Sequence, residues 1–274
     1  MHAITYARWL IYCVGPVNSR GWSPEPCNPG TGRYPRACMD KKHSNISEKS
    51  AEVIEAFRKT YDIFQASYPM DETKIVAKSW NKIGASYHAA RNLNKIDDIL
   101  EDFASKLHTG AKILDAGSGS GVPASRFMDQ KGFDVTGIDV STTMLEMARR
   151  NVPGGHFLRM DMRKLEFPAS HFDGITCLFA LFHVARKYHD DVVKQFYQVL
   201  KPGGLLLLNT GISGSEGFSR FFGEQMFWSN YPPRKTLEIV RSAGFIIEFE
   251  GNLRRGGEIQ YWIKARKPPL PYQD

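Results

Sequence analysis

The chain has 274 residues, of which 42% are hydrophobic and 24% are charged, so it is long enough to bury one large core or two smaller ones. This composition excludes collagen-like, low-complexity and largely disordered chains. No apolar run approaches the roughly 20 residues that a membrane-spanning helix needs, so we expect no integral membrane protein. Thirty-six basic and 29 acidic residues give a net charge of +7, which we interpret as a solvated basic surface.

Cysteine occurs four times, at Cys13, Cys27, Cys38 and Cys177, without a C-x-x-C pair or a closely spaced histidine. We therefore predict no metal site and expect free, reduced thiols. The apolar stretch after Arg8 lacks the small-residue pattern of a signal-peptide cleavage site. These features predict a cytoplasmic protein.

Residues 1–43 differ from the rest of the chain because repeated prolines and glycines break any periodicity. We interpret them as a poorly ordered leader. Met39 and Met70 each precede a helical pattern, so we expect the natural start at one of them. Residues 44–110 then read as a helical segment, with amphipathic patterns from Ser47, over 73–87 and over 96–107.

Short apolar runs alternate with helical patterns after Gly110. We predict strands over 112–115, 134–140, 156–161, 174–179 and 205–209, and helices over 123–130, 144–150 and 190–200. Thr143 and Glu146 have the spacing of a capping box. Such alternation predicts a parallel sheet covered by helices on both faces, a doubly wound α/β fold.

The C-terminal part of the chain departs from this alternation. A helix is predicted over 236–243, and strands over 245–250 and 259–264 flank the short basic turn 254–257. A connection this short forces an antiparallel pair. The sequence therefore predicts a mostly parallel seven-stranded sheet with an antiparallel last strand.

A glycine-rich loop follows the first predicted strand, with Gly117, Gly119 and Gly121 at alternate positions. Glycine lets the backbone turn tightly and approach a ligand where a Cβ would interfere. Val122 occupies the place of the third glycine of the dinucleotide fingerprint, which argues against an NAD-dependent oxidoreductase.

Two acidic residues stand at the ends of the next two predicted strands. Asp139 closes the second strand, 22 residues after Gly117, where its carboxylate can accept hydrogen bonds from ribose hydroxyls. Asp161 and Met162 close the third strand. A Lys201-Pro202-Gly203-Gly204 turn then leads into the fifth strand.

In this order, the motifs resemble those of class I S-adenosylmethionine-dependent methyltransferases of the small-molecule type, over residues 113–208 and more loosely over 74–267. The resemblance implies a Rossmann-like catalytic domain over 111–274, a helical segment over 44–110 that packs on the cofactor site, and S-adenosyl-L-methionine as cofactor. Asp139 would bind the ribose; Asp161 and Met162 would bind the adenine. The implied cofactor-binding residues are Asp115, Gly117, Ser118, Gly119, Gly121, Asp139, Val140, Met144, Asp161, Met162, Phe179 and Tyr87.

His183 follows the fourth predicted strand, at the end of the sheet where ligands of such folds bind. It is the candidate general base for methyl transfer, although a histidine among apolar neighbours also fits a structural role. His88, His171 and His189 have weaker claims. Cys177 lies inside a strand and reads as a buried thiol.

The insertion at 212–233 carries six aromatic residues, namely Phe218, Phe221, Phe222, Phe227, Trp228 and Tyr231. They fit an apolar substrate pocket or lid, or equally the packing of an inserted helix. Trp80 and Tyr87, in the helix before the sheet, are expected to cover the cofactor from the other side.

These features predict a metal-independent methyltransferase that acts on an O, N, S or C nucleophile of a small, partly apolar molecule, with no nucleic-acid or membrane partner. The oligomeric state stays open. Two alternatives remain: an RNA-modifying methyltransferase that uses the positive charge, and a non-catalytic scaffold that binds the cofactor.

Overall fold

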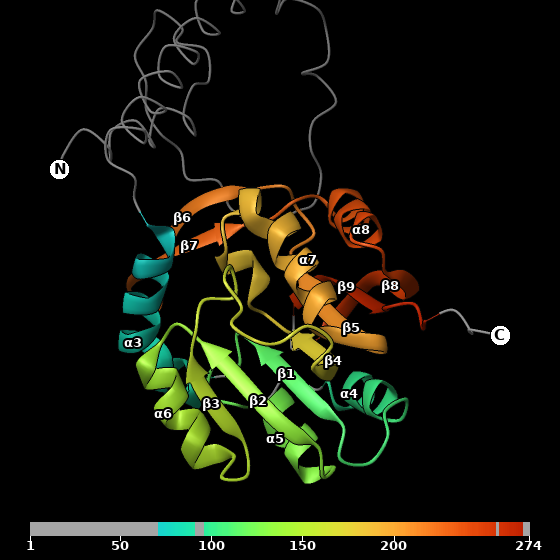
Figure 1. Ribbon diagram of the computed structural model, residues 1–274. Helices are drawn as coiled ribbons and strands as arrows, with labels where there is room; N and C mark the ends of the chain where they lie inside the picture. The colour runs from blue at the N-terminus through green and yellow to red at the C-terminus, as the bar shows by residue number, and fades with distance from the viewer. Residues whose placement is uncertain (1–70, 91–95, 256–257, 271–274) are drawn as a thin grey trace, which may run out of the picture. The chain divides into compact units, whose positions relative to one another are not determined.

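A computed structural model of the chain describes residues 71–90, 96–255 and 258–270 (Figure 1). All of them belong to one unit, residues 68–274. The predicted leader over 1–43 and the helix predicted from Ser47 lie outside the described residues. No helix in the described ranges combines the length and apolarity needed to cross a membrane.

A seven-stranded sheet forms the centre of this unit, in the order β3-β2-β1-β4-β5-β9-β8. The strands are β1 Lys112–Ala116, β2 Asp134–Asp139, β3 His156–Arg159, β4 Phe172–Cys177, β5 Leu200–Thr210, β8 Ile246–Arg255 and β9 Glu258–Arg266. The first five pair in parallel, and β9 runs antiparallel to both β5 and β8. The predicted sheet is therefore confirmed.

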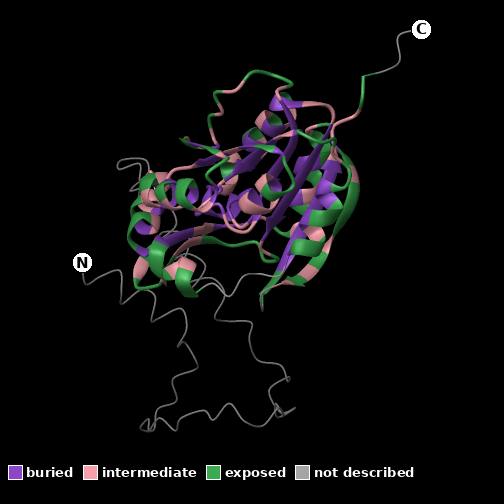
Figure 2. Cartoon of the chain, turned by 90° about the horizontal axis from the view of Figure 1, so that it is seen from below, coloured by how far each residue is buried: buried purple, intermediate pink, exposed green. Residues whose placement is uncertain are grey.

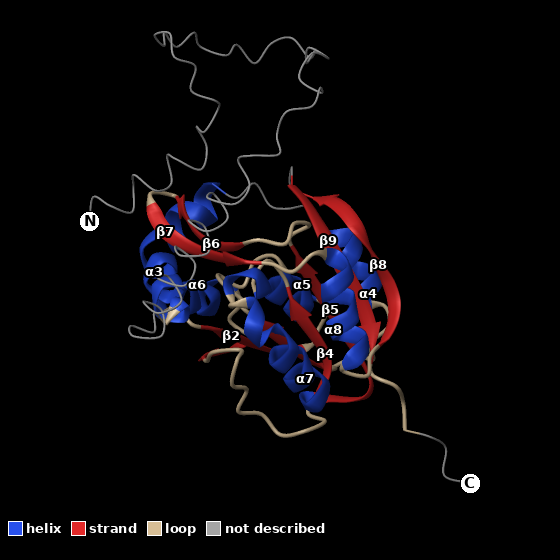
Figure 3. Cartoon of the chain, turned by 90° about the horizontal axis from the view of Figure 1, so that it is seen from above, coloured by secondary structure: helices blue, strands red, loops and turns tan. Residues whose placement is uncertain are grey.

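Helices cover both faces of the sheet, as Figure 3 shows from above. They are α3 Glu72–Ala90, α4 Asp97–Ala104, α5 Ala124–Gln130, α6 Thr142–Asn151, α7 His189–Val199 and α8 Pro233–Ser242. Leu205 and Leu207 of β5 pack in the core cluster with α4 and α5, whereas Leu206 and Leu208 pack in the cluster with α7 and α8. The run of four leucines is thus apolar throughout because both faces of a central parallel strand are buried (Figure 2).

The insertion does not form a helix, which was one of the two expectations for its aromatic residues. It forms an antiparallel hairpin of β6 Glu216–Phe221 and β7 Glu224–Ser229. Phe222 and Gly223 make the two-residue turn, with φ of 49° and 84°. Two residues with positive φ are what a tight hairpin turn needs, because they match the right-handed twist of the strands.

Several local predictions were wrong. Strand β3 ends at Arg159, so Asp161 and Met162 follow the strand rather than close it. Strand β5 begins at Leu200, so residues 201–204 belong to the strand rather than to a turn before it. The capping box at Thr143 and Glu146 does not form, because α6 begins at Thr142 and Ser141 is its N-cap, with its Oγ 3.2 Å from the amide nitrogen of Met144. Strand β4 ends at Cys177 rather than Phe179. Phe179 instead has a φ of 57°, which takes the chain out of the sheet.

Candidate functional site

The glycine-rich loop turns sharply after β1. The amides of Gly117 and Ser118 both donate to the carbonyl oxygen of Ile138, at 2.8 and 2.9 Å. Gly117 has a φ of 78°, and a Cβ there would lie 2.3 Å from the Cβ of Ala180. Only glycine fits this close approach of two loops.

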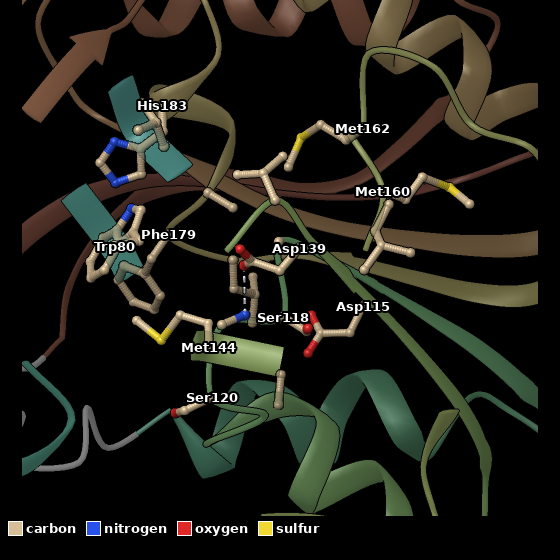
Figure 4. Close-up of a pocket in the computed structure, with 18 of the residues that line it drawn as sticks. Trp80, Asp115, Ser118, Ser120, Asp139, Met144, Met160, Met162, Phe179 and His183 are labelled. Carbon is tan, nitrogen blue, oxygen red and sulfur yellow. Dashed lines mark hydrogen bonds between the residues drawn. The ribbon is translucent and has the colours of Figure 1, made fainter. Parts of the chain in front are cut away.

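A pocket opens where the carboxyl ends of β1, β2 and β4 meet (Figure 4). Trp80, Phe179 and His183 lie together on one side of it, and Asp115 lies on the other. All the predicted cofactor-binding residues line this pocket except one, as do Trp80, His88 and His183. The exception is Gly121, whose missing Cβ leaves room for Val152 and Ala148.

The Asp139 carboxylate lies at the end of β2, inside the pocket. Its Oδ2 accepts a hydrogen bond from the Gly119 amide at 2.9 Å, and its Oδ1 accepts one from the Ser141 amide at 2.8 Å. Each oxygen keeps a lone pair for a further donor. Burial raises the pKa of Asp139 to about 6, despite these two hydrogen bonds.

The Asp115 carboxylate is occupied by the protein itself. It accepts hydrogen bonds from Ser125 Oγ at 2.6 Å and Thr176 Oγ1 at 2.8 Å, so it ties β1 to α5 and β4. Burial raises its pKa. Asp115 therefore stabilises the pocket by connecting the elements that form it.

Arg163 is a site residue that the sequence analysis missed. Its Nε donates to Asp161 Oδ2 at 2.8 Å, and its backbone amide donates to Asp161 Oδ1 at 2.9 Å. The same guanidinium reaches Asp71, just before α3, at 3.4 Å. Asp161 is thus held in place by Arg163, and its sequence neighbours Met160 and Met162 also line the pocket.

Helix α3 closes one side of the pocket. Asn81 Oδ1 accepts hydrogen bonds from Ser141 Oγ at 2.8 Å and from the Thr143 amide at 3.2 Å, next to Asp139. His88 Nδ1 lies 3.0 Å from Ser120 Oγ in the glycine-rich loop. The helix is therefore attached directly to the segments that form the pocket.

The β6–β7 hairpin holds α3 from the other side. Ser79 Oγ donates to the carbonyl oxygen of Gln225 at 2.6 Å, and Lys82 pairs with Glu224 at 2.9 Å. Val76 and Ile83 of α3 pack with Met226 and Phe227 in one apolar cluster.

A second cavity of about 400 Å³ adjoins the first. Trp80, Tyr87, Phe179 and His183 line both. The remaining lining residues are Ala90, Phe182, Gly211, Phe221, Phe222, Trp228, Asn230, Glu258 and Gln260. Three of the six aromatic residues of the insertion therefore line this cavity, while Phe218 packs on Phe227 and Tyr231 on His189.

His183 stands at the boundary of the two cavities and is 8% exposed. Its Nδ1 lies 2.9 Å from the carbonyl oxygen of Phe227. A carbonyl oxygen can only accept, so Nδ1 carries the hydrogen and Nε2 keeps a lone pair. Burial lowers the pKa of His183 to about 4, so the ring is neutral at pH 7.

Three further candidates, His171, His189 and Cys177, lie outside both cavities. His189 is buried with its Nε2 2.9 Å from the Val184 carbonyl, and His171 packs on Phe172. Cys177 is buried at the end of β4, and burial raises the pKa of its thiol. None of these three lines either cavity.

Phe179 forms part of the wall between the cavities in a strained conformation. A positive φ is rare for a bulky residue and costs about 1–3 kcal/mol, which contacts with the surroundings must offset. Here Asn209 Oδ1 accepts a hydrogen bond from the Phe179 amide at 2.6 Å. Asn209 is fully buried and also donates to Gln260.

We expect Asn209→Ala to lower the free energy of unfolding by about 1–3 kcal/mol, because it removes the hydrogen bonds that Asn209 makes with the Phe179 amide and with Gln260 Oε1. Denaturant unfolding measures this change. Asn252→Ala, at an exposed position of β8, is the control and is expected to change the value by less than about 0.5 kcal/mol. Equal values for the two variants would contradict the role given to Asn209.

Comparisons with known proteins agree with this geometry. Residues 113–204 match the family model described as a methyltransferase domain. The chain is 37% identical over 159 residues to the ubiquinone/menaquinone biosynthesis C-methyltransferase UbiE of Azotobacter vinelandii, an alignment that spans 53% of this chain and 62% of the relative. It is 29% identical over 194 residues to the demethylmenaquinone methyltransferase of Symbiobacterium thermophilum, covering 65% and 75%.

Solved structures show the same fold. The crystal structure of magnesium protoporphyrin IX methyltransferase from Synechocystis PCC 6803 with bound SAM matches with a TM-score of 0.59 at 17% identity. The match covers 72% of this chain and 98% of that one.

Proposed function

The chain belongs to the class I S-adenosylmethionine-dependent methyltransferases, and we propose that it methylates a small, partly apolar molecule. The observation that carries this proposal is the pair of adjoining cavities. The first has a glycine-rich loop and a buried carboxylate; the second has aromatic walls; Trp80, Phe179 and His183 line both. A cofactor and an acceptor bound in them would meet at these three side chains.

The residues of the first cavity fit the cofactor. Asp139 has lone pairs left for two ribose hydroxyls, and Gly119 leaves open space, since no protein atom lies within 4 Å of its missing Cβ. Asp161 and Met162 would hold the adenine. When bound, S-adenosylmethionine supplies a methyl group on a positively charged sulfur, and the carbon–sulfur bond breaks as the bond to the acceptor forms, with its electron pair left on sulfur.

The protein contributes alignment, exclusion of water and a proton acceptor. Well-oriented reactants lower the barrier of such a displacement by roughly 7–11 kcal/mol. We propose that His183 Nε2 accepts the proton that an acceptor hydroxyl or amine loses. The neutral imidazole keeps the Nε2 lone pair that this role needs, whereas burial, which lowers the pKa of His183 to about 4, makes the ring a weak base.

We propose further that residues 111–274 are the catalytic domain, that α3 belongs to the cover predicted for residues 44–110, and that the protein is cytoplasmic. A small acceptor is favoured over RNA because no lysine or arginine is among the described residues that line the two cavities, whereas an RNA site would expose basic groups to phosphates. A non-catalytic scaffold would bind the cofactor but transfer no methyl group.

Cofactor affinity is expected to depend on pH through Asp139. Its pKa of about 6 means that the carboxylate is ionised above pH 6 and protonated below it. Protonation removes a lone pair and the charge that strengthens hydrogen bonds from the ribose, so affinity should be full at pH 7.5 and fall through pH 6. Calorimetric titration with S-adenosylhomocysteine between pH 7.5 and 5 measures this.

Asp139→Asn separates the contribution of Asp139 from pH effects that arise elsewhere in the chain. We expect it to bind about 100-fold more weakly at pH 7.5, with little further change down to pH 5. A wild-type affinity that stays constant to pH 5 would contradict the assignment of Asp139.

The proposed function is tested in two steps. Calorimetry with S-adenosylhomocysteine and with NADH on the purified chain is expected to show binding of the first only. Incubation of cell extract with methyl-labelled cofactor, followed by mass spectrometry, then identifies the labelled product. Cofactor binding without any labelled product in extracts that contain the acceptor would favour the scaffold.

A further inference from the structure

We infer that the second cavity takes a planar aromatic acceptor that carries a hydroxyl group and a separate oxygen, such as a carbonyl, and that Asn230 determines this specificity by donating to that oxygen. The inference rests on the proposed function and extends it, because it names the chemical class of the acceptor.

The walls of the cavity favour a flat ring. Trp228 contacts Phe182 with ring centroids 5.6 Å apart and an angle of 34°, and it contacts Phe221 at 5.4 Å and 89°. Phe222 and Tyr87 extend the same wall, 5.8 Å apart. Aromatic side chains gain from stacked and edge-to-face contacts with a further ring, beyond the burial of apolar area.

Asn230 adds a hydrogen-bond donor to these walls. It is 8% exposed, and its Oδ1 accepts a hydrogen bond from the Gly211 amide at 2.7 Å. That bond fixes the orientation of the carboxamide, because an amide hydrogen needs an oxygen opposite it. Nδ2 makes no hydrogen bond within the described part of the chain, so a nearly buried donor remains for a ligand oxygen.

Gln260 also lines this cavity, but its carboxamide already has hydrogen-bond partners in the protein. Gln260 accepts from Asn209 through its Oε1 and donates to Glu258 Oε2 at 3.2 Å. Both ends of its carboxamide thus have protein partners. The Asn230 donor group, in contrast, has no hydrogen-bond partner among the described residues.

His183 supplies the complementary acceptor. Because its Nδ1 hydrogen is donated to the Phe227 carbonyl, its Nε2 can accept from a hydroxyl group. His183 also lines the first cavity, so the hydroxyl it binds is the group that would be methylated. On transfer, the hydroxyl oxygen would bond to the methyl carbon while the carbon–sulfur bond breaks and leaves its electron pair on sulfur. The hydroxyl proton would move to Nε2 and then to water once the product leaves.

The test uses a matched set of small probes. The meta and para isomers of hydroxyacetophenone carry both groups, the corresponding ethylphenols lack the carbonyl, and acetophenone lacks the hydroxyl. Affinities are measured by ligand-observed NMR titration with saturating S-adenosylhomocysteine. At least one hydroxyacetophenone is expected to bind about tenfold more tightly than its ethylphenol and than acetophenone.

Asn230→Asp is the decisive variant. An aspartate oxygen still accepts from the Gly211 amide, but the donor is lost, so we expect the preference for the carbonyl to disappear. Asn252→Asp makes the same chemical change at an exposed position of β8 and should keep the preference. Thermal unfolding of both variants confirms that they are folded.

Three results would overturn the inference in a chain that binds S-adenosylhomocysteine: no probe binds, the wild type binds each hydroxyacetophenone no better than its ethylphenol, or Asn230→Asp retains the tenfold preference. A wild-type chain that does not bind S-adenosylhomocysteine would contradict the proposed function instead. The two failures are therefore distinguishable.

Discussion

Gly119→Val is expected to weaken S-adenosylhomocysteine binding at least 100-fold while the chain still unfolds cooperatively. Gly119 has a φ of 53°, and no protein atom lies within 4 Å of the position of a Cβ. A valine side chain would therefore occupy the pocket itself rather than collide with the protein. It would also strain the amide that holds Asp139.

Gly110→Val is the matched control for this substitution. Gly110 has a φ of 74°, also has no protein atom within 4 Å of a Cβ, and lies outside both cavities in the turn before β1. Both variants bear a similar backbone strain of about 1–3 kcal/mol, so both should lose stability. Only Gly119→Val should lose affinity in calorimetry, and comparable affinities would refute the placement of the cofactor.

His183→Gln is expected to lower kcat by about 10² to 10⁴-fold and to leave the Kd for S-adenosylhomocysteine unchanged. Glutamine can still donate to the Phe227 carbonyl, but its amide does not take up a proton. Turnover is measured with the acceptor recovered from extract. Because the pKa of His183 is about 4, ionisation of this residue should not limit wild-type kcat between pH 5.5 and 8.

His189→Gln is the matched control, because it makes the same substitution at another buried histidine, six residues after His183. His189 is 1% exposed, contacts the Val184 carbonyl and lines neither cavity. This variant should lose stability and keep kcat. If His183→Gln instead turned over at the wild-type rate, His183 would be a structural residue, as a histidine among apolar neighbours can be.

The sheet could be predicted because its signals are local. Each of its seven strands overlaps a strand predicted from the sequence, and the four consecutive leucines of β5 already indicated a strand buried on both faces. The hairpin could not be predicted in the same way. Its turn is Phe222-Gly223, and phenylalanine does not give the asparagine- or aspartate-glycine signal that marks such turns.

The site likewise contains residues that could be predicted from local sequence signals and residues that could not. Asp139 and the glycine-rich loop stand at strand ends, so their convergence follows from a parallel sheet. Asn209 and Phe179 are 30 residues apart, and His183 and Phe227 are 44 apart. Such pairs depend on how loops pack after the sheet has formed, and neither residue type nor spacing indicates them. Asn230 was overlooked for this reason.

The attachment of α3 couples the two cavities. Asn81 fixes this helix to the segment beside Asp139, Ser79 and Lys82 fix it to the hairpin, and Trp80 between them borders both cavities. A ligand that tightens one attachment would restrain the other, and thermodynamic linkage makes such cooperativity equal in both directions. We therefore expect each ligand to raise the affinity of the chain for the other by the same factor.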